Sequence, residues 1–367
     1  MRIAFIASGT NNAQRWVNYI ARKGHEVHLI CREGMAGYDN SVHIHLLTRL
    51  YPRSWALSQY PSFLFWIFQA RKLVKRMKPD IVDGHFITIY GFLAACSGFH
   101  PLVVTAMGSD ILINPKRNLL LRTLTRYALK KADTVVCNSE TVKMGLLELG
   151  TEPEKIRVIY NGIDTEQFYP RLKDEDIINR WDVARVPLII SIRNLRPIYN
   201  VEMLIKAVPL VLRQFPEAKF IIGGDGELRD YLESLIVSLG VSDAVRFTGF
   251  IPHDEIPGYL ASSDVYVSTS LSDGTSFSLQ EAMACELAPV VTDLPANREW
   301  ATDGETGFIV SVNDIQALAD RVVYLLKNDE VRRRFGRRGR EIIQARAEYQ
   351  KEMGKLVEVY DMLVASS

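Results

Sequence analysis

Short apolar runs alternate with amphipathic stretches along the chain. In the first such unit, an apolar run over residues 2–7 is followed by a small polar loop at 8–10, an amphipathic stretch over 13–22 and a second apolar run over 26–31. Short apolar runs between turn residues are typical of strands buried in a parallel sheet, and a period of 3.6 residues is typical of a helix. The unit therefore predicts the strand, loop, helix and strand that begin a doubly wound α/β domain.

The same alternation continues through most of the chain and is interrupted once. It weakens over 168–187, where two prolines and mixed charges give no clean period. We place a domain junction there and expect an N-terminal domain over 1–167, a C-terminal domain over 168–346 and a closing helical segment over 347–367. Further strands are expected at 41–47, 79–85, 101–106, 134–137, 155–160, 188–192, 218–222, 245–247, 265–268, 289–292 and 304–309.

The composition is that of an ordinary globular protein with an ample core. Of the 367 residues, 47% are hydrophobic and 24% are charged. The longest tight apolar run, 63–68, is too short to span a bilayer, and the N-terminus predicts a strand with no secretory signal ahead of it. The four cysteines are widely spread without metal-binding spacing, which predicts reduced thiols and a cytoplasmic location.

Positive charge is concentrated in the first part of the chain. Residues 1–166 hold 21 Lys and Arg against 13 Asp and Glu, whereas the remainder holds 23 against 30. Two basic stretches, 57–78 and 118–131, can rest on an anionic membrane surface at the inner face of the plasma membrane, or they can be core helices with a solvated cationic end. An anionic partner and a chance division of surface charge are the two interpretations of this asymmetry, and we expect no nucleic acid partner.

The stretch 271–295 carries the clearest chemistry. A polar loop at 273–276 leads into a helical pattern over 277–287 and then a short apolar strand. Gly274 lets a ligand approach the backbone closely, and Thr275 or Ser276 can cap the helix, whose N-terminus favours an anion. With the carboxylates of Asp273 and Glu281 available for hydroxyl groups, the arrangement suits a nucleotide sugar. The alternative is that Ser278 and Glu281 form a capping box and bind only the helix backbone.

This stretch resembles the donor-site signature of the retaining glycosyltransferases of family 4, which is an acidic residue, seven further residues and Glu-Ala-Met-Ala. Asp273 stands where the family usually has the first Glu. The resemblance extends along the chain to the opening strand and loop, and to the motifs Asn161-Gly162-Ile163-Asp164, Gly224-Asp225-Gly226-Glu227 and Thr248-Gly249-Phe250-Ile251-Pro252. It implies the GT-B fold: two doubly wound Rossmann-like domains with a cleft between them, the first for the acceptor and the second for the nucleotide sugar, and a C-terminal helix that crosses back to the first domain.

The resemblance also assigns donor-binding roles. Glu281 is expected to hold the ribose hydroxyls, Asp273 to contact the sugar, and the N–H groups of Ser276 and Phe277 to face the diphosphate. Phe250 and Ile251 are expected to flank the base through backbone contacts, although plain packing would also explain Phe250. The remaining expected donor-binding residues are Asn194, Gly224, Gly226, Gly274 and Thr275.

Two positions depart from the family pattern on the donor side. Asn194 falls where the family has an Arg that stabilises the leaving diphosphate, and Tyr199 falls where it has a Lys. The nearby cations are Arg193 and Arg196, and we expect Arg193 to supply the positive charge. The alternative is that both are solvated loop arginines.

Acceptor-side residues are expected at the carboxyl ends of the first domain's strands, where open α/β sheets bind ligands. These are Gly9 and Thr10 in the first loop, His85, and Asp110. Met107 stands where family members commonly have His, and Met can neither orient a sugar hydroxyl nor relay a proton. The retaining class is thought to pass the acceptor proton to the leaving phosphate, so the missing His does not by itself abolish turnover.

The resemblance implies a retaining, metal-independent glycosyltransferase without a cofactor. It would move a hexose from a UDP- or GDP-sugar to a glycan, a lipid-linked acceptor or a small polar acceptor. A catalytically weak or inactive sugar-nucleotide-binding subunit of a glycosyltransferase complex is the first alternative, because of Met107, Asn194 and Tyr199. An epimerase that acts on the nucleotide sugar is the second, and the 271–295 signature favours a transferase over it.

Overall fold

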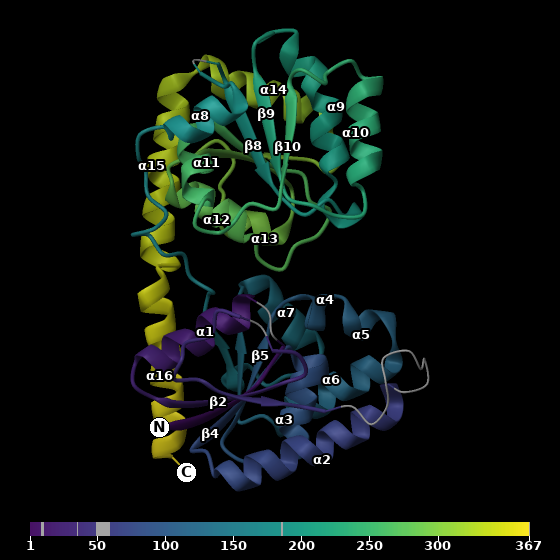
Figure 1. Cartoon of the computed structure of the whole chain (residues 1–367), viewed down its shortest axis with the longest axis vertical. Coiled ribbons are helices and arrows are strands. Elements are labelled where there is room, and N and C mark those ends of the chain that lie inside the picture. The colour runs from purple at the N-terminus through teal and green to yellow at the C-terminus, as the bar shows by residue number, and fades with distance from the viewer. Residues whose placement is uncertain (9–10, 35, 49–58, 185, 367) are drawn as a thin grey trace. The chain divides into compact units, whose positions relative to one another are not determined.

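The structure, a computed structural model, describes residues 1–8, 11–34, 36–48, 59–184 and 186–366. It divides into two compact units, each built around a parallel sheet with helices on both faces (Figure 1). Unit 1 comprises residues 1–161 and the C-terminal segment from Gln350, and unit 2 comprises Gly162–Tyr349. The expected fold class, two Rossmann-like domains in the GT-B manner, is confirmed.

The described residues of unit 1 form a seven-stranded parallel sheet in the order β3-β2-β1-β4-β5-β6-β7. Strands buried on both faces of a sheet have continuous apolar sequences, and this is why short apolar runs predict most of these strands. The strands are β1 (Arg2–Ile6), β2 (Glu26–Cys31), β3 (His43–Leu46), β4 (Ile81–His85), β5 (Leu102–Ala106), β6 (Thr134–Cys137) and β7 (Ile156–Val158). The helices are α1 (Asn11–Arg22), α2 (Gln59–Met77), the π-helix η2 (Ile87–Gly91), α3 (Phe92–Ser97), α4 (Ser109–Leu112), α5 (Asn114–Arg117), α6 (Leu119–Lys131), α7 (Glu140–Glu148), η3 (Pro153–Lys155) and α16 (Tyr349–Ala365).

The two faces of this sheet have different helical covers. Helices α2, α3 and α6 pack as neighbours on one face, where Trp66, Ala70 and Val74 of α2 are buried in the core (Figure 1). On the other face the Tyr360 hydroxyl of α16 donates a hydrogen bond to the buried carboxylate of Asp83 on β4. Polar contacts of this kind tie the last helix of the chain to the sheet of unit 1.

The described residues of unit 2 form a six-stranded parallel sheet in the order β10-β9-β8-β11-β12-β13. Its core lies between the sheet and helices α9, α10 and α14, with Leu204, Val208, Phe220 and Leu318 almost fully buried. The strands are β8 (Leu188–Ile192), β9 (Lys219–Gly223), β10 (Val245–Gly249), β11 (Val265–Ser268), β12 (Ala288–Thr292) and β13 (Phe308–Val310). The helices are α8 (Glu175–Trp181), η4 (Pro197–Tyr199), α9 (Val201–Leu212), α10 (Arg229–Ser238), α11 (Ile256–Ser262), α12 (Phe277–Ala284), α13 (Pro295–Arg298), α14 (Ile315–Lys327) and α15 (Asp329–Arg346).

Helix α8 was not predicted, because the sequence over 168–187 shows no clean period. The structure shows how it forms despite that. The Asp174 side chain accepts hydrogen bonds from the N–H groups of Asp176 and Ile177, and Ile177 is buried. A good N-cap and one buried apolar residue are enough for a helix of two turns that packs on a larger unit.

Candidate functional site

The loop 273–276 lies between β11 and α12 in unit 2, at the carboxyl end of a central strand of the sheet. Ser276 occupies the N-cap position of α12, but its hydroxyl accepts a hydrogen bond from Arg193 and makes no cap bond. The Thr275 hydroxyl accepts from Nε2 of Gln280, at 3.0 Å. The prediction that one of these side chains caps the helix is therefore wrong. Both hydroxyls instead accept hydrogen bonds from other side chains, those of Arg193 and Gln280.

Arg193 is the centre of a buried polar cluster that includes side chains of this loop. It follows β8 directly, and its Nη2 lies 2.8 Å from Oδ2 of Asp273, with the two side chains only 10% and 12% exposed. Its Nε donates to the Ser268 hydroxyl at 3.1 Å, and its guanidinium lies over the Tyr199 ring, 5.3 Å from the centroid. The alternative of a solvated loop arginine is wrong for Arg193, and it fits Arg196, which is exposed.

The guanidinium of Arg193 stays protonated although it is buried. Burial lowers the pKa of the guanidinium, but Tyr266, Asp273 and Tyr199 act against it and the net pKa lies above the ordinary value. Arg193 is thus a fixed cation at the N-terminus of α12. Sequence spacing had placed Asn194 at the cationic position of the family pattern, and the structure leaves Asn194 exposed.

The Glu281 side chain contacts His253, a partner that the sequence did not identify. Its carboxylate is almost fully buried, and Oε1 lies 3.0 Å from Nε2 of His253, in the loop after β10. The capping-box alternative is wrong, because Ser278 lies inside α12 and its hydroxyl is 2.8 Å from that of Tyr266. His253 comes directly after the motif Thr248–Pro252. That position in the sequence is the one feature that could have marked His253 as a site residue.

Glycines hold two neighbouring loops in close contact. Gly224 has φ +131°, and a Cβ there would lie 2.2 Å from the carbonyl oxygen of Arg193. A Cβ on Gly226 would lie 2.4 Å from the carbonyl oxygen of Leu195. Both positions therefore require glycine for the loop after β9 to pack on residues 193–195. These two expected donor-binding residues support the Arg193 loop directly.

Phe250 and Ile251 follow β10 and differ sharply in exposure. Phe250 is 76% exposed, which rules out plain core packing, whereas Ile251 is buried against Gly223. An exposed aromatic side chain beside a buried aliphatic one leaves the backbone of this loop at the surface of unit 2. Roles for both residues stay predictions.

The acceptor-side residues lie in unit 1, where Met107 and Asp110 share one turn. Asp110 is fully buried and accepts hydrogen bonds from the N–H groups of Ile87, Met107 and Gly108 at 2.7, 3.0 and 2.9 Å. Burial raises its pKa to about 6 although these N–H groups act against the rise. Asp110 holds the turn after β5 to the start of η2.

His85 is also buried, at the end of β4. Its Nε2 lies 3.4 Å from Oδ2 of Asp83, and its ring packs edge-on against Phe5 and Trp16. Neither His85 nor Asp110 offers an open side chain in place of the His that Met107 replaces. The expected residues Gly9 and Thr10 lie outside the described residues.

Two further features are absent from the described residues, a metal-binding cluster and a membrane-spanning helix. These residues contain no group of three or more His, Cys, Asp and Glu side chains arranged to hold a metal ion. In the same residues, every helix is too short or too polar to cross a membrane.

Comparisons with known proteins agree on one family. The model described as glycosyltransferase family 4 matches residues 11–167, and that described as glycosyl transferases group 1 matches 174–342. The N-acetyl-alpha-D-glucosaminyl L-malate synthase of Bacillus anthracis is 26% identical over 93% of this chain and 90% of its own length. An Escherichia coli UDP-Gal:alpha-D-GlcNAc-diphosphoundecaprenol alpha-1,3-galactosyltransferase is 27% identical over 92% and 90%. The Anabaena HepE structure in complex with UDP-glucose superposes with a TM-score of 0.79 at 21% identity, covering 99% of this chain and 100% of that one.

Proposed function

The chain belongs to the GT4-type glycosyltransferases and is a transferase enzyme, and from that premise we propose that it moves a hexose from a UDP- or GDP-sugar to an acceptor with retention of configuration. The observation that carries the proposal is the cluster of Arg193, Asp273 and Ser276 at the start of α12, with Glu281 on the same helix. A nucleotide-sugar donor is supported by the Escherichia coli relative, whose name includes UDP-Gal, and by the HepE structure, which is a complex with UDP-glucose.

The donor is proposed to lie along the first turns of α12. The helix N-terminus and the buried Arg193 cation attract the diphosphate, because both present positive charge that needs no proton transfer. Glu281, held by His253, accepts hydrogen bonds from the ribose hydroxyls. Asp273 contacts the sugar, and Phe250 and Ile251 flank the base with their backbone.

The leaving group is the nucleoside diphosphate, on which negative charge develops as the bond to the sugar breaks. Arg193 stabilises that charge, and the exposed Arg196 is the second cation of the same loop. No metal or cofactor takes part in this proposal. The acceptor hydroxyl passes its proton to the leaving phosphate on the same face of the sugar, so Met107 needs no proton-relay function.

The acceptor is proposed to approach unit 1 and to be a glycan, a lipid-linked molecule or a small polar compound. Two helices on one face of unit 1 suit an anionic membrane surface and would place the enzyme in the cytoplasm at the inner face of the plasma membrane. Helix α2 exposes Leu64 and Phe68 beside Arg71, and α6 exposes Leu119 and Leu120. Apolar side chains next to bases are what an interfacial helix needs. The core-helix interpretation also holds for α2, since its opposite side is buried.

One observation favours a second candidate, an inactive sugar-nucleotide-binding subunit. The Arg193 cation is already paired with Asp273, at 2.8 Å, so part of its charge is neutralised before any diphosphate binds. An enzyme in which that pair does not loosen would hold the donor without stabilising the leaving group.

A thermal-shift screen separates the candidates. The chain is tested with UDP, GDP, ADP and their common sugar conjugates, and the stabilising conjugate is then assayed for slow hydrolysis. Binding with hydrolysis or transfer is the result that the enzyme proposal predicts. Binding without either reaction would favour the subunit, and the absence of any nucleotide-dependent shift would contradict both.

A further inference from the structure

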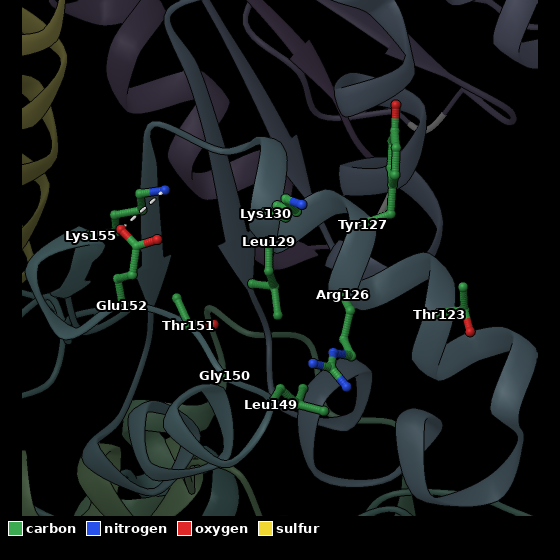
Figure 2. Close-up of a pocket in the computed structure, with 10 residues that line it drawn as sticks. All are labelled: Thr123, Arg126, Tyr127, Leu129, Lys130, Leu149, Gly150, Thr151, Glu152 and Lys155. Carbon is green, nitrogen blue, oxygen red and sulfur yellow. Dashed lines mark ion pairs between the residues drawn. The ribbon is translucent and has the colours of Figure 1, made fainter.

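A pocket of about 580 Å³ lies beside α6 in unit 1, and Figure 2 shows the residues that line it. Its walls come from the C-terminal half of α6, from the segment after α7, and from η3. A second hollow of about 420 Å³ shares Leu149 with it and continues toward the N-terminal end of α6. The two hollows adjoin at Leu149, and we refer to them together as the groove.

Positive charge dominates the groove. The first pocket is lined by Arg126, Lys130 and Lys155 against one carboxylate, Glu152. Lys155 lies 3.4 Å from Glu152, whereas the described residues offer Arg126 and Lys130 no ion-pair partner. The second hollow adds Lys116, Arg117 and Arg122 against Glu148. Like charges gathered in one concave site raise the local concentration of anions.

Cations near the end of a helix also have an ordinary explanation, because they complement the helix dipole and stay solvated. A second observation points to a ligand instead. The Thr151 side chain is 7% exposed, and its buried hydroxyl has no hydrogen-bond partner among the described residues. Thr151 is one of the residues that line the pocket (Figure 2). A buried hydroxyl that is left unpaired costs folding free energy and calls for a partner.

The guanidinium of Arg126, the strongest anion-binding group of the pocket, lies close to the backbone beside Thr151. Gly150 has φ +88°, and a Cβ at that position would lie 3.9 Å from Nη2 of Arg126. The guanidinium therefore rests near the Gly150–Thr151 backbone, and Figure 2 shows it directed toward that segment. The buried Leu129 and half-buried Leu149 supply an apolar floor.

We propose that this pocket binds a phosphate group. A phosphate offers several acceptor oxygens, so the guanidinium of Arg126, the ammonium of Lys130 and the hydroxyl of Thr151 can each donate to it. The volume exceeds that of an isolated phosphate ion, and the apolar floor accommodates the group that carries the phosphate. The source is the headgroup of an anionic lipid or a soluble phosphate compound, and the inference does not rest on the proposed function.

The test is calorimetric titration of the full chain, with its donor site saturated by the nucleotide that the thermal-shift screen identifies, using two probes: pyrophosphate and dihexanoyl phosphatidic acid below its micellar concentration. Arg126→Gln and Lys130→Gln are each expected to weaken binding by about tenfold or more, as expected for a lost charge-assisted hydrogen bond. Lys131→Gln is the matched control, because Lys131 is an exposed base on the same helix outside the groove, and it is expected to leave the affinity within about twofold.

Thr151→Val distinguishes a ligand contact from general surface charge. It is expected to weaken binding by roughly two- to tenfold and to leave the ligand-free protein at least as thermally stable, since an unpaired buried hydroxyl is removed. All four variants are expected to bind UDP as the unmodified protein does, which separates this site from the donor site. Preference for the lipid probe would identify a headgroup as the source, and equal binding of pyrophosphate would identify a soluble phosphate.

The inference is overturned if neither probe binds, if Lys131→Gln weakens binding as much as Arg126→Gln, or if Thr151→Val destabilises the ligand-free protein. Loss of UDP affinity in the groove variants would also overturn it, because the groove would then belong to the donor site.

Discussion

Replacing Arg193 with Gln is the perturbation that the structure predicts to be most severe. The guanidinium contacts Asp273 at 2.8 Å and Ser268 at 3.1 Å, in surroundings where both members of the ion pair are about nine-tenths buried. Removing one partner leaves a buried carboxylate uncompensated, so we expect a loss of about 3–5 kcal/mol in the free energy of unfolding. If Arg193 stabilises the leaving diphosphate, turnover falls by about 10²–10³-fold as well.

The assay is a double-mutant cycle with Arg193→Gln, Asp273→Asn and the double variant, followed by urea denaturation and by donor hydrolysis. Because the two side chains interact directly, the double variant is expected to lose about 1–3 kcal/mol less than the sum of the single losses. Arg196→Gln serves as the control, since Arg196 is an exposed cation of the same loop, and its effect on stability is expected to stay within about 0.5 kcal/mol.

Two results would refute this reasoning. Additive losses in the cycle would mean that Arg193 and Asp273 are not coupled. Turnover that survives Arg193→Gln but falls in Arg196→Gln would assign the leaving-group role to Arg196.

Three further predictions address other parts of the molecule. His253→Ala is expected to weaken donor binding by about three- to tenfold, because Glu281 loses its hydrogen-bond partner; an unchanged dissociation constant in calorimetry would show that His253 does not orient Glu281. Gly224→Ala is expected to lower the free energy of unfolding by more than about 1 kcal/mol, because φ is +131° and the new Cβ meets a backbone oxygen; a wild-type thermal melt would contradict that. Burial raises the pKa of Asp110 from 3.8 to about 6, so the folded state binds this proton more tightly than the unfolded state and loses about 3 kcal/mol as pH rises from about 4 through 6. Urea denaturation against pH should show that loss in the unmodified protein and not in Asp110→Asn; parallel pH profiles would refute it.

The sequence predicted the fold well because parallel strands are buried on both faces. Their apolar runs mark β1, β5 and β8 in the sequence almost directly, since no exposed side chain interrupts the pattern. Helix α8 escaped prediction because its stability comes from one cap and from packing, and neither leaves a long periodic signal.

The candidate site was predicted less completely, for a physical reason. The contacts of Arg193 with Ser276 and of Glu281 with His253 join residues 83 and 28 positions apart, and no local pattern encodes them. The spacing Ser278-x-x-Glu281 suggested a capping box, but the helix begins with Ser276 at its N-cap and not with Ser278. Local spacing identified the right loop and helix, whereas tertiary packing decided which side chains meet there.

The most direct test of the account is a crystal structure of the chain with a bound UDP- or GDP-sugar. The account predicts the diphosphate at the N-terminus of α12 beside Arg193, with the ribose hydroxyls within hydrogen-bond distance of Glu281. A nucleotide bound elsewhere, or a Glu281 carboxylate that contacts His253 alone while the donor is present, would contradict it.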